Sequence, residues 1–137
     1  MRIVLTGADG FIGKNLRIRL QECALGQVVA ITRASSPADL GAALRDADVV
    51  FHLAGVNRPQ DPSEFHTGNF GVTREICEVL TQSGRPATVI YASSTQAALD
   101  APYGASKLEA ERSPIAYGQA TGAPIRLLRL PNGVGKW

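Results

Sequence analysis

Short apolar runs alternate with stretches of helical spacing along the whole chain, and this alternation constrains the fold more than any other feature. Predicted strands lie at 3–5, 28–32, 49–54, 88–92 and 125–130. Apolar residues recur at helical spacing at 11–20, 40–44, 72–80 and from Tyr103 to about Tyr117. Continuous apolar strands alternating with helices are typical of a parallel sheet covered on both faces. A helix that connects two parallel strands makes a right-handed crossover. We therefore predict a doubly wound, three-layer α/β/α fold, as one domain over residues 1–137.

Composition excludes several classes of protein. The formal net charge of +2 over 137 residues gives no electrostatic footprint for DNA or RNA, and 45% apolar content argues against disorder. No apolar run approaches the roughly 20 residues that span a membrane. Met1 is followed at once by an apolar run rather than a basic leader, and the two cysteines, Cys23 and Cys77, lack metal-ligand spacing. We therefore expect a cytoplasmic protein without a metal site, a nucleic-acid partner or a membrane partner.

A glycine-spaced loop follows the first predicted strand. The segment T-G-A-D-G-F-I-G at 6–13 places Gly7, Gly10 and Gly13 three residues apart, just as the first helix begins. A tight turn and a backbone that approaches a pyrophosphate closely both need residues without a Cβ. The helix beginning near Phe11 would point its amides and its positive dipole end at that phosphate. A plain strand-to-helix turn is the alternative, but the position at the first strand–helix junction favours a Rossmann-type dinucleotide site.

The end of the second predicted strand bears on the choice of cofactor. An acidic residue there accepts the ribose hydroxyl of NAD, whereas an arginine suits the 2′-phosphate of NADP. This chain has Arg33 at that point and no acid before Asp39. Arg33 could also be an exposed residue of a polar loop, but the charge favours NADPH or NADP over NAD.

Tyr103 and Lys107 have a Y-x-x-x-K spacing, which places both on one face of a helix. A free tyrosine has a pKa of about 10, and a nearby cation favours its phenolate, so the pair could exchange a proton with a carbinol oxygen. Hydroxyls at the end of the preceding strand, from Ser93 to Thr95, could hold a substrate carbonyl. Asn69 could hold a water or a cofactor amide near Lys107, although the serines could equally cap a strand and Asn69 a helix.

Together, T-G-A-D-G-F-I-G, H-L-A-G at 52–55, Asn69, Ser93-Ser94 and Y-G-A-S-K resemble the extended short-chain dehydrogenases/reductases, the NAD-dependent epimerase/dehydratase family. The segments 52–59, 101–111 and 128–137 are similar to one bacterial branch, the reductases of the UDP-N-acetyl-L-fucosamine pathway for capsule and O-antigen sugars. In that branch an NADPH-binding reductase domain precedes a zinc-binding cupin domain. The resemblance implies reduction of a UDP-linked 4-keto-6-deoxy-acetamido sugar. It also implies a possible homodimer, because related enzymes dimerise through the helix at 72–80 and the Tyr103 helix.

The resemblance also implies roles for individual residues. Ser94 would be the catalytic hydroxyl, Tyr103 the general acid, and Lys107 the residue that binds the nicotinamide ribose and tunes Tyr103, while Asn132 would contact the sugar nucleotide. The expected cofactor-binding residues are Gly7, Gly10, Phe11, Ile12, Gly13, Arg33, Leu53, Ala54, Gly55, Asn69 and Lys107.

Three departures from the family pattern shape our expectations. The segment between Arg33 and Asp48 is short, and the usual acidic adenine-contact motif after the third strand is not visible, which leaves the adenine contacts undefined. Pro114 lies inside the Tyr103 helix and predicts a shorter helix or a kink. The chain ends at Trp137, before the substrate lobe and cupin domain of relatives, so we expect a fragment that is inactive on its own.

Two other functions remain as alternatives. The first is an NAD-dependent sugar-nucleotide 4-epimerase or dehydratase, against which Arg33 argues. The second is a non-catalytic NADP-binding interaction module, against which the intact Tyr103 and Lys107 argue. The stripe Val72, Ile76, Val79 and Leu80 could pair with another subunit, but packing on the sheet is the simpler interpretation.

Overall fold

The computed structural model describes residues 1–32, 35–53, 72–84, 87–94 and 102–130. The strands are β1 (Arg2–Thr6), β2 (Gln27–Ile31), β3 (Val49–His52), β4 (Thr88–Ser94) and β5 (Ile125–Leu130). The helices are α1 (Phe11–Cys23), α2 (Pro37–Arg45), α4 (Val72–Gln82) and α5 (Pro102–Thr121). Strands and helices alternate among these elements, as predicted.

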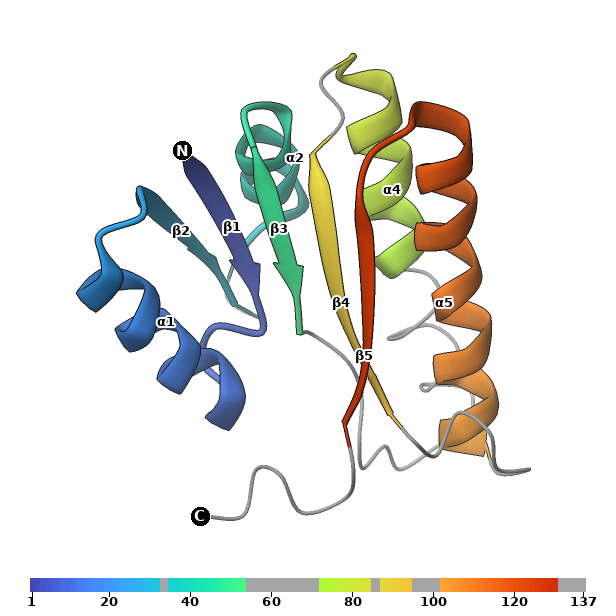
Figure 1. Ribbon diagram of the computed structural model, residues 1–137, viewed down its shortest axis with the longest axis horizontal. Coiled ribbons are helices and arrows are strands. Elements are labelled where there is room, and N and C mark those ends of the chain that lie inside the picture. Colours follow the sequence, from blue (N-terminus) through green and yellow to red (C-terminus); the bar gives the residue numbers. More distant parts are fainter. Residues whose placement is uncertain (33–34, 54–71, 85–86, 95–101, 131–137) are drawn as a thin grey trace.

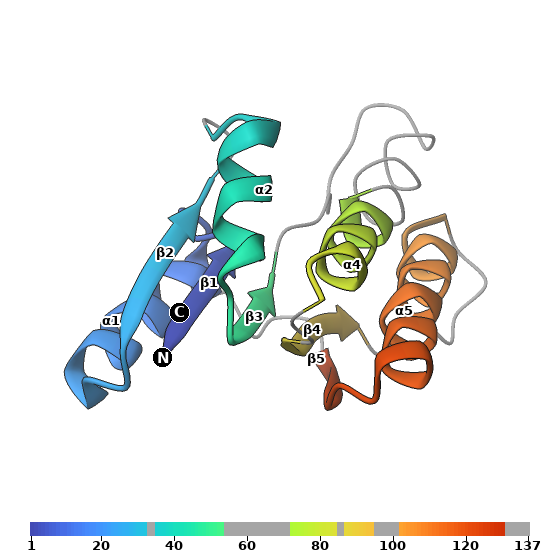
Figure 2. The same cartoon turned by 90° about the horizontal axis from the view of Figure 1, so that it is seen from above.

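The five strands form one parallel sheet in the order β2-β1-β3-β4-β5. Helix α1 lies on one side of the sheet, and α2, α4 and α5 lie on the other (Figures 1 and 2). The predicted three-layer, doubly wound α/β fold is therefore confirmed. From β1 the chain moves outward to β2 and later returns to the other side of β1 as β3. The boundary between β1 and β3 is thus the switch point, outside whose carboxyl ends such sheets bind ligands.

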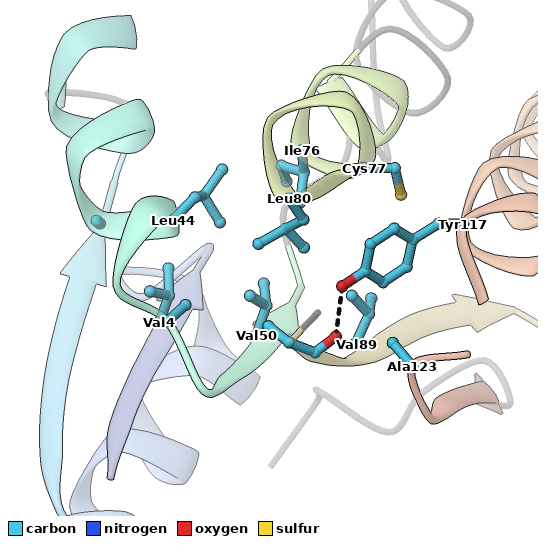
Figure 3. Close-up of a cluster of buried hydrophobic side chains, with 12 residues drawn as sticks. Val4, Leu44, Val50, Ile76, Cys77, Leu80, Val89, Tyr117 and Ala123 are labelled. Carbon is cyan, nitrogen blue, oxygen red and sulfur yellow. Dashed lines mark hydrogen bonds between the residues drawn. The ribbon is translucent and has the colours of Figure 1, made fainter. Parts of the chain in front are cut away.

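The main core lies between the sheet and the three helices on its second side. Val4, Val50 and Val89 come from three neighbouring strands, and each is at most 1% exposed (Figure 3). They meet Leu44 of α2, Ile76 and Leu80 of α4, and Tyr117 of α5. Val72 and Val79 pack against the same cluster. The stripe on α4 therefore packs on the sheet, as we expected.

The segment after β2 forms the predicted helix, which begins earlier than expected, at Pro37, and has a capped N-terminus. The hydroxyl of Ser36 accepts a hydrogen bond from the Asp39 amide at 3.1 Å, and the Asp39 carboxylate accepts one from the Ser36 amide at 3.0 Å. This capping box and the proline at 37 fix the start of α2. The described residues 35–48 contain no strand, so β2 is an edge strand of the described sheet.

Helix α5 corrects the expectation drawn from Pro114. The helix continues past this proline to Thr121, so the prediction of a shorter helix is wrong. Proline removes one intrahelical hydrogen bond, but the tertiary contacts beyond it hold the helix. Glu111, Pro114 and Tyr117 are buried at intervals of three residues along one face. The Tyr117 hydroxyl donates a 2.7 Å hydrogen bond to the Ala87 carbonyl, which ties the second half of α5 to the start of β4 (Figure 3).

Candidate functional site

The carboxyl ends of the strands and the first turns of α1, α4 and α5 lie along one edge of the sheet, at the lower end of Figure 1. The glycine loop follows β1, Leu53 follows β3, and Ser94 is the last residue of β4. This edge brings together segments that are far apart in the sequence. It is the place where a doubly wound sheet binds a dinucleotide.

The glycine loop has the geometry that a pyrophosphate requires. Gly7 adopts a positive φ of 66°, and its carbonyl accepts a hydrogen bond from the Gly10 amide at 3.1 Å. Gly10 is the N-cap of α1 and offers no side-chain cap to the first-turn amides. A Cβ on Gly13 would lie 2.0 Å from the Gly7 oxygen, so only glycine allows α1 to approach the strand this closely. The described part of the loop therefore fits a bound pyrophosphate.

We predict that Gly13→Ala destabilises the fold and weakens NADPH binding together. The added methyl would also lie 2.9 Å from the Ala8 Cα, so the backbone of the loop must shift. Overpacking of this kind costs about 1–3 kcal/mol. Thermal unfolding followed by circular dichroism, with NADPH titration, measures both effects.

Gly41→Ala is the matched control for this substitution. Gly41 lies within α2, and the nearest atom to its added methyl is an Arg45 nitrogen at 4.0 Å. Alanine should raise stability there by up to about 1 kcal/mol. If Gly13→Ala behaved like Gly41→Ala, neither stability nor NADPH binding would require the close approach of α1 to the glycine loop.

The three predicted catalytic positions fall on two elements that meet at this edge. Ser94 ends β4, and Tyr103 and Lys107 both lie in the first two turns of α5. The four-residue spacing of Tyr103 and Lys107 is therefore a helical spacing, as the sequence predicted. The side chains of these three residues and of Phe11 are outside what the structure describes.

Other predicted site residues divide between described and undescribed segments. Ile12 and Leu53 are half-buried, in the first turn of α1 and just after β3. Five predicted residues lie outside the described part of the chain: Arg33, Ala54, Gly55, Asn69 and Asn132. Their assigned roles stay predictions.

A buried polar cluster under this edge was not predicted from the sequence. The Leu53 amide donates to the Thr6 hydroxyl at 3.0 Å, and that hydroxyl lies 2.7 Å from His52 Nδ1. His52 Nε2 lies 2.9 Å from the hydroxyl of Thr73. One signal was available, since His52 is the one polar residue in the apolar run at 49–54. Its partners are 46 and 21 residues away, and no local pattern identifies them.

Cys77 is not a candidate nucleophile. It lines a shallow groove of about 330 Å³ between α4 and α5, together with Tyr117. Burial, with a smaller contribution from the Glu78 carboxylate, raises the pKa of the Cys77 thiol to about 12. Burial likewise raises the pKa of the Tyr117 phenol. Both groups therefore stay protonated at neutral pH, and neither supplies a nucleophile or a base.

Within the described segments, no group of three His, Cys, Asp or Glu side chains could hold a metal ion. None of the described helices is both long and apolar enough to cross a membrane.

Residues 3–137 match the family model described as the NAD dependent epimerase/dehydratase family. The chain is also 44% identical, over all of its 137 residues, to UDP-2-acetamido-2,6-beta-L-arabino-hexul-4-ose reductase of Pseudomonas aeruginosa strain PA103. It spans 37% of the length of that relative.

Two solved structures show the same arrangement of the chain. The capsular polysaccharide assembling protein CapF of Staphylococcus aureus superposes with a TM-score of 0.83 at 38% identity, over 96% of this chain and 36% of CapF. RMD from Pseudomonas aeruginosa, complexed with NADPH, gives a TM-score of 0.76 at 27% identity, over 96% of this chain and 55% of RMD.

Proposed function

The chain belongs to the NAD dependent epimerase/dehydratase family, and we propose that it is the cofactor-binding part of an NADPH-dependent reductase. The proposed substrate is a UDP-linked 4-keto-6-deoxy-acetamido sugar, reduced in the synthesis of capsule or O-antigen precursors. The observation that carries this proposal is the 44% identity to a UDP-acetamido-hexul-4-ose reductase over the whole chain. The glycine loop and the spacing of Tyr103 and Lys107 in α5 support it.

The proposed roles combine the family resemblance with the order of the elements at the carboxyl edge. The glycine loop, with Phe11 and Ile12, would hold the pyrophosphate against the first turn of α1. Leu53, Ala54 and Gly55 would line the cofactor as the chain leaves β3, and Asn69 would hold a water or the cofactor amide. Asn132, after β5, would contact the sugar nucleotide.

The chemistry requires a hydride and a proton. When bound, NADPH supplies the hydride to the C4 carbonyl carbon. Ser94 would donate a hydrogen bond to the carbonyl oxygen, and Tyr103 would donate the proton that completes the new hydroxyl. Lys107 would stabilise the phenolate that Tyr103 becomes and contact the nicotinamide ribose.

The choice of NADPH over NADH rests on the end of β2. Asp39, the first acidic residue after β2, is engaged in the capping box of α2, where its carboxylate accepts from the Ser36 amide. That carboxylate already has a structural role, which weakens it as a ribose acceptor. Arg33 is the cation that would pair with the 2′-phosphate.

We expect the whole enzyme to bind NADPH more tightly than NADH, and Arg33→Ala to remove this preference. A charge-assisted contact with the 2′-phosphate contributes about 1.5–3 kcal/mol, roughly tenfold to a hundredfold in affinity. Calorimetric titration of both cofactors measures the difference. Arg19→Ala is the control, because this exposed arginine of α1 pairs with Glu22 three residues away. Equal affinities for both cofactors in the unmodified enzyme would contradict the assignment of Arg33.

The proposal also covers the oligomeric state and the cellular compartment of the whole enzyme. We propose a cytoplasmic homodimer in which α4 and α5, adjacent on one side of the sheet (Figure 2), form the contact surface.

A second function has one specific observation in its favour. The family description names NAD-dependent epimerases and dehydratases. Such an enzyme would keep its NAD bound and return the hydride to the sugar. Net oxidation of NADPH with a UDP-4-keto sugar separates the two, because only a reductase consumes the cofactor.

A further inference from the structure

Three of the four buried polar residues in the described part of the chain belong to one hydrogen-bonded cluster. Thr6 is 2% exposed, and His52 and Thr73 are each 1% exposed. The cluster lies at the carboxyl ends of β1 and β3, which is the switch point of the sheet. Buried polar groups are costly unless their hydrogen bonds are made. A buried polar cluster beneath the proposed cofactor site therefore needs a functional explanation.

The cluster continues the pairing of β1 with β3 by one step beyond the sheet. Thr6 and His52 are the last residue pair in the register of these two strands. Beyond them β1 turns into the glycine loop, and β3 runs into Leu53. The first amide after β3, that of Leu53, donates to the side chain of Thr6 instead of a backbone carbonyl. The Thr6 hydroxyl thus holds the two strands together at the point where they diverge.

His52 extends this connection to α4 and β4. Its Nδ1 contacts Thr6 at 2.7 Å, and its Nε2 contacts Thr73, in the first turn of α4, at 2.9 Å. The imidazole also stacks on the ring of Tyr91 in β4, with centroids 5.3 Å apart and planes 22° apart. One side chain therefore touches β1, α4 and β4 from its own strand β3.

The contacts of the ring are compatible with either tautomer. The Thr6 hydroxyl accepts from the Leu53 amide and has a second lone pair, so it can either donate to His52 Nδ1 or accept from it. The Thr73 hydroxyl can likewise accept from His52 Nε2 or donate to it. In both cases each ring nitrogen makes one hydrogen bond to a threonine hydroxyl.

We propose that His52 is a positioning residue that fixes the floor of the cofactor site. Thr6 directly precedes Gly7, Leu53 begins the segment assigned to the cofactor, and Thr73 lies four residues after Asn69. Three proposed cofactor-binding segments therefore leave the scaffold from residues that the cluster holds in place. This inference rests on the proposed binding of NADPH, and His52 itself is not assigned any contact with cofactor or substrate.

The first test is spectroscopic and needs no cofactor. Imidazole ¹⁵N shifts in the 137-residue chain should report a ring whose two nitrogens are both hydrogen-bonded. The only other histidine of the sequence is His66, so a His66→Gln variant assigns the signals. Thr6→Val should change the His52 shifts, and Thr6→Ser should restore them. Shifts that Thr6→Val leaves unchanged would overturn the proposed hydrogen bonding.

The second test measures NADPH affinity in the whole enzyme, well below the unfolding temperature of every variant. His52→Phe keeps a ring against Tyr91 but removes both hydrogen bonds, and Thr6→Val removes only one hydroxyl. We expect each to weaken NADPH binding on the order of tenfold, with Thr6→Ser restoring affinity. A purely structural residue would lower the unfolding temperature and leave the affinity of the folded enzyme unchanged.

Thr81→Val is the matched control for the second test. The Thr81 hydroxyl donates a 2.8 Å hydrogen bond to the Cys77 carbonyl on α4, away from the cluster. Its loss should leave NADPH affinity unchanged. If the unmodified enzyme binds NADPH and Thr6→Val binds it equally well, the positioning role is wrong. If the unmodified enzyme binds no NADPH, the proposed function fails, while the ¹⁵N shifts still decide whether the cluster exists.

Discussion

Replacement of Tyr103 by phenylalanine in the whole enzyme is expected to lower turnover by a factor on the order of 10²–10⁴. The substitution removes one hydroxyl, the proposed proton donor, from the first turn of α5. The glycine loop lies on a different element, so NADPH affinity should change little. Steady-state reduction of a UDP-4-keto sugar, with cofactor titration, measures both quantities.

Tyr117→Phe provides the matched control on the same helix. The Tyr117 hydroxyl donates to the Ala87 carbonyl inside the core, and its side chain is only 3% exposed. Its loss should reduce stability by about 1 kcal/mol without affecting the chemical step. Near-normal turnover by Tyr103→Phe would mean that another group supplies the proton.

The second large effect concerns the 137 residues on their own. We expect them to give no measurable reduction of a UDP-4-keto sugar and at most weak NADPH binding. Hydride transfer requires donor and acceptor to be held in near-attack geometry, which contributes a large part of the rate. The chain spans only 37% of the length of the reductase that it resembles. NADPH oxidation and calorimetry on the isolated chain are the measurements.

One face of the sheet gives a further reason to expect no activity and weak NADPH binding from the isolated chain. Ile90 and Leu128 belong to strands β4 and β5 and point away from the core shared with α4 and α5, toward the side of α1. Ile90 is half-buried, and Leu128 is 47% exposed. Among the described elements, α1 packs on β1 and β2 and leaves this part of the face uncovered (Figure 2). Robust turnover of a UDP-4-keto sugar by the isolated 137 residues would contradict the proposal that they are only the cofactor-binding part of the enzyme.

The fold was predictable because its signals are local. Each strand is rich in apolar residues, and the predicted strands at 49–54 and 125–130 therefore coincide with β3 and β5. The three glycines of the loop could be interpreted for the same reason, because the backbone atoms that leave no room for a side chain lie within the same short segment. Helix α2 starts at Pro37, ahead of the apolar spacing that predicts it at 40–44, because its start is set by the capping box of Ser36 and Asp39 and not by apolar residues.

Tertiary contacts explain what the sequence could not reveal. A proline at 114 predicts a break when only helix propensity is considered, but burial of Pro114 and Tyr117 outweighs one lost hydrogen bond. The partners of His52 are distant in sequence and meet only because β1 and β3 are neighbours in the sheet. A buried histidine in an apolar strand signals a polar partner, but topology alone shows which hydroxyls it contacts.

The stoichiometry of NADPH oxidation in the whole enzyme tests the central proposal most directly. The enzyme is supplied with NADPH and a UDP-linked 4-keto-6-deoxy-acetamido sugar, and both nucleotides are quantified as the reaction proceeds. We expect one NADPH to be oxidised for each keto sugar reduced to the corresponding alcohol. No net oxidation of NADPH with this keto sugar would contradict a reductase, and redox-neutral conversion of a UDP-sugar that carries a C4 hydroxyl would identify an epimerase or dehydratase instead.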